Sequence, residues 1–302
     1  MGVKHKQSSA VFSKQLTRKL RDKLNKESQK EASLKETVLE NSKLNSDREV
    51  DYSLFRPPTF SSLEDERQHL KQRLAAAYRL FAMHGFDEGL AGHITVRDPE
   101  NKDQFWVAPW GVHFSKMRAS DLHLIDHSGK VLLGNKPIND AAFAIHASIH
   151  KARPDLLAAA HAHSMYGRSF SVLGREIDPI SQDSCAFYEQ VAIYDEFGGV
   201  AMQDSEGERI AKALGDKRFA ILRHHGLLTT GESLESCIWF FIAMEKACQS
   251  QLLVEGKLGY KPIPHKVACE TRALVGSEIA GFASFNQLYQ TLVSKGDMSF
   301  LE

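Results

Sequence analysis

The chain has 302 residues, of which 42% are hydrophobic and 25% charged, and 38 Lys and Arg residues balance 38 Asp and Glu residues. This is the composition of an ordinary globular protein. The zero net charge gives no overall field that would draw the chain to nucleic acid or to an acidic membrane, and no apolar run approaches the ~20 residues of a membrane-spanning helix. Four scattered cysteines without a C-x-x-C pair favour a reducing compartment, so we expect a cytoplasmic protein.

Residues 1–55 form a polar N-terminal segment rich in Lys, Glu, Ser and Asn. Up to residue 50 its only aromatic residue is Phe12, so it cannot bury enough apolar surface to offset the entropy of the chain. We therefore expect a disordered or loosely helical tail. Arg56-Pro57-Pro58 predicts a stiff, extended linker, and residues 56–302 are expected to hold the folded domain.

The hydrophobic pattern of this domain predicts helices mixed with strands. Ser61 or Ser62 can cap a helix whose apolar face begins at Leu63 and ends near His84. The segments that follow are strands at 93–97, 104–108 and 122–126, a helix at 140–151, a strand at 156–161, a helix at 205–214, a strand at 219–222, and helices at 233–253, 265–274 and 284–293. Such a mixture predicts an α/β fold with a central sheet flanked by helices.

Two apolar strands end in histidines. In Ala158-Ala-Ala-His161-Ala-His163 both rings fall on one face, because side chains alternate along a strand with a period of two. His225 follows a second apolar strand and precedes a glycine, and strand ends at one edge of a sheet converge. Three imidazoles so placed suit a divalent metal; the alternative is that they hydrogen-bond within loops. We expect His224 to orient the site without binding metal.

Residues 89–253 resemble the class II aldolase/adducin family, in its adducin-like and putative class II aldolase branch, and the order of the motifs matches as well as their content. The motifs are Gly92-His-Ile-Thr95-Val-Arg97, Ala108-Pro-Trp-Gly111, Ser120-Asp121-Leu, Asp126-x-x-Gly129, Pro137-Ile-Asn139, His146, Ala152-Arg-Pro-Asp155, His161-Ala-His163 and His225-Gly226-Leu227. The resemblance implies a mainly antiparallel central sheet flanked by helices, with residues 254–302 as a helical extension. It also implies a homotetramer with active sites at subunit interfaces.

The same resemblance implies a metal and its ligands. In the enzymes of the family the histidines that match His161, His163 and His225 bind Zn²⁺ or a similar divalent ion, with Mn²⁺ and Fe²⁺ as alternatives. The ion polarises a carbonyl group and stabilises an enediolate.

Gly92, His93, Trp110 and Gly111 are the candidate substrate-binding residues. His93 stands where the family has an asparagine, either as a donor to the substrate or as a histidine of the turn. Trp110 and its neighbours either wall a pocket for a flat or apolar substrate or pack in the interior.

The sequence departs from the sugar-phosphate aldolases of the family at one stretch. Those enzymes carry Ser-Ser-Glu, with the glutamate four residues before a histidine that matches His146. Here that position is Ala142, and the two serines fall on Asp140 and Ala141. The usual acid/base carboxylate is therefore missing, and an aspartate in place of a serine would repel a phosphate dianion. We expect an unphosphorylated substrate.

Another group must then move protons, and two aspartates are candidates. Asp183 lies near the place where family enzymes have an acid or a tyrosine that reaches a neighbouring subunit's site; a purely structural role is the alternative. Asp140 starts a predicted helix, where a capping role is the stronger interpretation.

These observations favour a divalent-metal-dependent lyase that cleaves or decarboxylates a small, unphosphorylated oxo- or hydroxy-acid. Decarboxylation needs less general-base help than aldol cleavage, so the missing glutamate favours it. Two alternatives stay open: an adducin-like protein that associates with cytoskeletal or other partners without catalysis, and a non-haem iron oxygenase that uses the same three nitrogens. Analysis of the metal bound to the purified protein separates the three hypotheses. A protein without metal would favour the adducin-like alternative, bound ferrous iron would favour the oxygenase, and bound zinc or manganese would favour the lyase.

Overall fold

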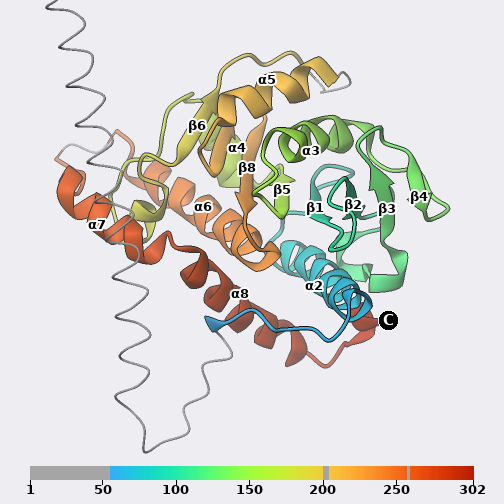
Figure 1. The fold of residues 1–302 in the computed structure, drawn as a ribbon. Helices are drawn as coiled ribbons and strands as arrows, with labels where there is room; N and C mark the ends of the chain where they lie inside the picture. The colour runs from blue at the N-terminus through green and yellow to red at the C-terminus, as the bar shows by residue number, and fades with distance from the viewer. Residues whose placement is uncertain (1–54, 200–203, 257–258) are drawn as a thin grey trace, which may run out of the picture. The chain divides into compact units, whose positions relative to one another are not determined.

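Eight strands form one sheet in the order β4-β3-β2-β1-β5-β8-β7-β6 in the computed structural model of the protein, which describes residues 55–199, 204–256 and 259–302 (Figure 1). The strands are β1 (His93–Arg97), β2 (Gln104–Val107), β3 (His123–Asp126), β4 (Val131–Leu133), β5 (Ala158–Ala162), β6 (Val191–Tyr194), β7 (Phe219–Leu222) and β8 (Gly226–Gly231). Every neighbouring pair is antiparallel except the parallel pair β6 and β7. The predicted mainly antiparallel sheet is confirmed.

Helices cover both faces of this sheet (Figure 1). They are α2 (Leu63–Met83), α3 (Asp140–Ala152), α4 (Met165–Ser171), α5 (Asp204–Leu214), α6 (Leu234–Val254), α7 (His265–Val275) and α8 (Glu278–Val293), together with the short 3₁₀ turns η2 (Phe114–Lys116), η3 (Ala119–Asp121), η4 (Asp183–Phe187) and η5 (Ser299–Leu301). Among the described helices, none is long and apolar enough to cross a membrane.

Alternate strand residues pack into different cores, which places the helices in two layers. Ile221 of β7 joins the larger core, which contains buried side chains of α2, α6 and α8. Its neighbours Ala220 and Leu222 join a second core with side chains of α3 and α5. Successive strand side chains point to opposite faces of a sheet, so α2, α6 and α8 lie on one face and α3 and α5 on the other.

Several predicted elements agree closely with the structure, and others were missed. The runs at 93–97 and 219–222 coincide with β1 and β7, and Ser62 caps α2 by accepting a hydrogen bond from the backbone N–H of Asp65. The strands β4, β6 and β8 and the helix α4 were not predicted. The predicted tail at 1–55 lies outside the described residues except for Phe55.

Candidate metal centre

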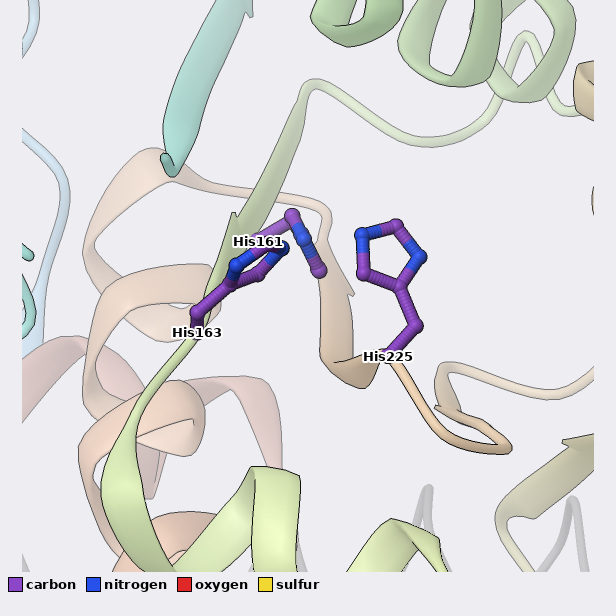
Figure 2. Close-up of side chains that lie close together, drawn as sticks. All are labelled: His161, His163 and His225. Carbon is purple, nitrogen blue, oxygen red and sulfur yellow. The ribbon is translucent and has the colours of Figure 1, made fainter. Parts of the chain in front are cut away.

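His161, His163 and His225 face one another where the central strands end (Figure 2). His161 lies in β5, His163 comes one residue after that strand, and His225 lies in the turn between β7 and β8. Their ring centroids are 4.6–5.1 Å apart, and one nitrogen from each lies within 4.8 Å of the others. The fold thus brings together the three histidines that the sequence singled out.

The hydrogen bonding of His161 leaves one nitrogen able to bind a metal. Its Nδ1 lies 2.7 Å from the backbone oxygen of Leu227, and a carbonyl only accepts, so Nδ1 carries the proton. The other nitrogen, Nε2, then holds a lone pair, yet it is buried without a hydrogen-bond partner. An unsatisfied buried polar atom costs about 1–3 kcal/mol. A cation at this point would remove that cost, and an N–H donated to a carbonyl is the usual support of a ligating histidine.

Electrostatics keep these rings neutral, as metal binding requires. Burial, followed by the nearby His163, lowers the pKa of His225 to about 4. Burial also lowers the pKa of His163, with a contribution from Arg168, and holds the pKa of His161 well below its ordinary value. All three rings therefore have a free lone pair at neutral pH.

The turn that carries His225 depends on its two neighbours. Gly226 has φ +152° and lies so close to β5 that a Cβ there would be 3.1 Å from the backbone oxygen of Ala162. His224 adopts φ +62°, a region that non-glycine residues seldom occupy. The His224 side chain is exposed and its ring centroid lies 6.1 Å from that of Phe197, so it stands outside the cluster of donor atoms.

Glu245 fixes the segment that follows His163. This buried carboxylate of α6 accepts hydrogen bonds from Ser164 Oγ at 2.6 Å, Tyr166 N at 2.8 Å and Gly167 N at 2.6 Å. The amides belong to the first turn of α4, where backbone N–H groups have no partner within the helix and a negative charge is favourable. Glu245 thereby holds the backbone next to His163 in place.

Glu245→Gln is expected to lower the free energy of unfolding by about 1–3 kcal/mol, because one of the buried acceptors becomes a donor facing other donors. It should also weaken metal binding by roughly 10-fold, since the segment after His163 loosens. Thermal unfolding and metal titration measure the two effects. Glu270→Gln, at an exposed glutamate of α7, is the matched control; equal losses in both variants would contradict the bracing role.

A second group of buried histidines adjoins the first. His93 lies opposite His161 in the β1–β5 register, and its ring centroid is 5.1 Å from that of His161 and 4.2 Å from that of His146. Thr95 Oγ1 lies 2.8 Å from His146 Nδ1 and 2.9 Å from His150 Nε2. A hydroxyl has one proton, so Thr95 donates to one ring and accepts from the other. Sequence reasoning missed this network, although His146 and His150 stand four residues apart on a predicted helix.

Burial makes this group sensitive to acid, because it holds the pKa values of His93, His146 and His150 well below the ordinary value. Below about pH 6.5 the unfolded chain therefore binds protons that the folded chain does not. In protein stripped of metal, the free energy of unfolding should fall as the pH drops, by about 1.4 kcal/mol per pH unit for each such histidine. Denaturant unfolding between pH 7.5 and 5 would measure the slope. His150→Gln should reduce this slope by the contribution of one histidine. An unchanged slope would refute the conclusion that burial keeps His150 neutral in the folded chain.

A cavity of about 130 Å³ lies beside His93. All four predicted substrate-binding residues, Gly92, His93, Trp110 and Gly111, contribute to its lining. The other lining residues are Tyr78, Asp87, Gly89, Leu90, Val107, Ala108, Pro109, Val112, His113, Phe114 and Asn139, with no lysine or arginine among them. The walls are thus mostly apolar, and no lysine or arginine among these lining residues could pair with a phosphate.

The cavity holds one titratable pair that sequence reasoning did not identify. His113 Nε2 lies 3.3 Å from Asp87 Oδ2, and both residues line the cavity. No motif brings them together, because Asp87 follows α2 and His113 precedes η2.

Of the two predicted acid/base aspartates, the structure places the side chain of Asp183 alone. Asp183 is exposed, begins η4 and lines a groove with Trp239 and Lys246 of α6, so it is not part of the cavity lining beside His93. Asp140 begins α3, and its side chain is outside the part of the chain that the structure describes, as is that of Ala142.

Known proteins resemble this chain in sequence and fold. Residues 72–252 match the family described as Class II Aldolase and Adducin N-terminal domain. The 4-hydroxy-3-prenylphenylpyruvate oxygenase/4-hydroxy-3-prenylbenzoate synthase of Streptomyces roseochromogenus subsp. oscitans is 40% identical over 79% of this chain and 87% of its own length. Decarboxylase NovR of Streptomyces niveus is 39% identical over 82% of this chain and 93% of its own length. A structure of L-fuculose 1-phosphate aldolase from Glaciozyma antarctica PI12 is 43% identical with a TM-score of 0.77, covering 82% of this chain and 98% of that one. The chain therefore belongs to the class II aldolase and adducin family.

Proposed function

We propose that this protein is a divalent-metal-dependent lyase that cleaves or decarboxylates a small, unphosphorylated oxo- or hydroxy-acid. The observation that carries the proposal is the buried, unpartnered Nε2 of His161, which lies in one cluster with donor nitrogens of His163 and His225. Three neutral imidazoles, with no fourth ligand among the described residues, are the donor set of a catalytic zinc site that keeps an open position. Zn²⁺ is our first choice of metal, and Mn²⁺ and Fe²⁺ are the alternatives.

A divalent ion held by these histidines would stabilise the negative charge that develops on oxygen when a carbon–carbon bond next to a carbonyl breaks. The protein's own contribution is to hold the ligands and to enclose the substrate. His161 keeps the tautomer that directs its lone pair at the site, and the mostly apolar walls beside His93 would surround the substrate's carbon skeleton.

The choice of an unphosphorylated acid rests on three points. Within the part of the chain that the structure describes, no lysine or arginine lines the cavity beside His93. Asp140 and Ala141 replace the two serines of the sugar-phosphate aldolases. Decarboxylase NovR, a relative at 39% identity, has a name that fits loss of carbon dioxide. The similar structure from Glaciozyma antarctica has a name that specifies a sugar phosphate, so the assay must include both substrate classes.

The test uses the full chain loaded with zinc or manganese. Small keto- and hydroxy-acids, and sugar phosphates of equal chain length, are screened first by thermal shift, because a bound ligand raises the melting temperature by mass action. Carbon dioxide and aldehyde release are then measured. Turnover of an unphosphorylated acid that stops with a chelator is the expected result. Turnover of sugar phosphates alone would overturn the substrate class, and turnover that survives metal removal would overturn the metal dependence.

A second candidate function is a non-haem iron oxygenase. The name of the relative at 40% identity includes an oxygenase activity, and three nitrogens with open positions also suit ferrous iron. Substrate-dependent consumption of dioxygen by the iron-loaded protein would favour it, whereas equal product release under anaerobic conditions favours the lyase. A non-catalytic adducin-like role in cytoskeletal association predicts a purified protein without bound metal.

The setting of the activity is also a proposal. We place the enzyme in the cytoplasm, on the basis of its cysteine usage. We expect a homotetramer with active sites at subunit interfaces, because Asp183, our first candidate for the acid/base group, does not line the cavity beside His93 within one chain. Size-exclusion chromatography with light scattering would measure the assembly.

A further inference from the structure

Three side chains of types that can bind a metal meet outside the histidine triad. Glu189 lies between η4 and β6, His265 is the first residue of α7, and Cys269 follows it by one helical turn. Residues four apart on a helix share a face, so both α7 side chains point the same way. One ligand atom from each of the three residues lies within 4.8 Å of the other two.

The distances within this cluster are close to those of a tetrahedral zinc site. His265 Nδ1 is 3.5 Å from Glu189 Oε1, and Cys269 Sγ is 3.8 Å from both His265 Nδ1 and Glu189 Oε2. Zinc bonds of about 2.0–2.1 Å to nitrogen or oxygen and about 2.3 Å to sulfur place tetrahedral donors roughly 3.3 Å and 3.5 Å apart. Small rotations of the exposed Glu189 and His265 side chains would bring the donor atoms to these separations.

The backbone presents the carboxylate of Glu189 to α7. Glu189 adopts φ +60°, a left-handed conformation that non-glycine residues seldom adopt. Arg272, one turn beyond Cys269, donates to the backbone oxygen of Tyr188 at 2.7 Å and to Glu189 Oε2 at 3.2 Å. The glutamate is thus held in position before any ion arrives, which reduces the entropy lost on binding.

We propose that Glu189, His265 and Cys269 bind a borderline-soft divalent cation, zinc by preference, with water completing the coordination. A thiolate, an imidazole and a carboxylate form a mixed donor set that suits Zn²⁺ and is too soft for Mg²⁺ or Ca²⁺. On binding, the Cys269 thiol releases its proton to solvent and forms an S–Zn bond, while Arg272 balances part of the negative charge. The ion would clip α7 to the segment that precedes β6. This site is independent of the proposed lyase activity.

Cobalt(II) alone is the probe that separates this site from the triad, because only a site with a cysteine ligand gives thiolate-to-cobalt charge-transfer absorption. The full chain should bind about one equivalent of cobalt that shows this absorption. His161→Ala should keep the band and Cys269→Ser should lose it. A cobalt-loaded chain without the band, or a band that survives Cys269→Ser, would overturn the proposal.

Matched glutamate variants test the geometry. Glu189→Gln removes the charge of a ligand and should weaken cobalt binding at this site by at least 10-fold. Glu270→Gln removes the same charge from an exposed position on α7 and should leave cobalt binding unchanged. Circular dichroism confirms that each variant folds. Equal affinities in the two variants would exclude Glu189 as a ligand and, with it, the three-residue site.

Discussion

His161→Ala is expected to lower the affinity for divalent metal by more than about 100-fold. Loss of a partner that only orients a ligand costs about 10–100-fold in affinity, and His161 is itself a proposed ligand whose buried Nε2 has no other partner. Removal of His163 or His225 should have an effect of the same order. Metal content after dialysis and a competition titration with a chromophoric chelator would measure the losses.

The matched control for these variants is His224→Ala. His224 is the direct neighbour of His225, yet its exposed ring lies outside the donor cluster, so most of the metal should remain. Because His224 adopts φ +62°, the substitution also reports what distortion of the turn alone would do. Equal metal loss in all four variants would refute the ligand assignment, and loss in none would refute the metal site.

The fold was predictable wherever a segment carried its own hydrophobic pattern. The run Phe219–Leu222 is apolar throughout and became β7, and the long apolar helix near 233–253 became α6. The strand β8, Gly226–Gly231, was missed because two glycines and two threonines among its six residues give no apolar run, although the strand is buried at every position. Its neighbours β5 and β7 supply the hydrogen bonds that define it, and no local pattern contains that information.

In the candidate site too, the features set by a local sequence pattern were predictable and those set by contacts between distant segments were not. His161, His163 and His225 were predictable because each stands at the end of a recognisable strand, and strand ends meet at a sheet edge. The hydrogen bond from His161 Nδ1 to the backbone oxygen of Leu227 was not predictable, because it depends on the β5–β8 register. The clusters around Thr95 and around Cys269 arise from packing between segments far apart in the chain, so spacing alone could not reveal either.

Asp183→Asn is expected to lower turnover by about 10²–10⁴-fold, with metal content and assembly unchanged, if Asp183 is the proton-moving group that replaces the missing glutamate. The substitution preserves size and removes the charge. In one chain Asp183 lies in a groove with Trp239 and Lys246 and not beside His93, so this role requires a neighbouring subunit. Steady-state kinetics on the substrate found by the screen measure the loss, and Asp216→Asn, at another exposed aspartate, is the control.

A mixing experiment decides whether Asp183 acts across an interface. Asp183→Asn and His161→Ala chains are each expected to be inactive, but a mixed oligomer contains sites that combine an intact Asp183 with a neighbour's intact histidines. Activity should therefore return when the two variants are co-expressed. If Asp183→Asn is fully active, or if co-expression restores nothing, the proton must come from within the chain. Asp87 would then be the next group to replace, because it already lines the cavity beside His93 and pairs with His113 at 3.3 Å.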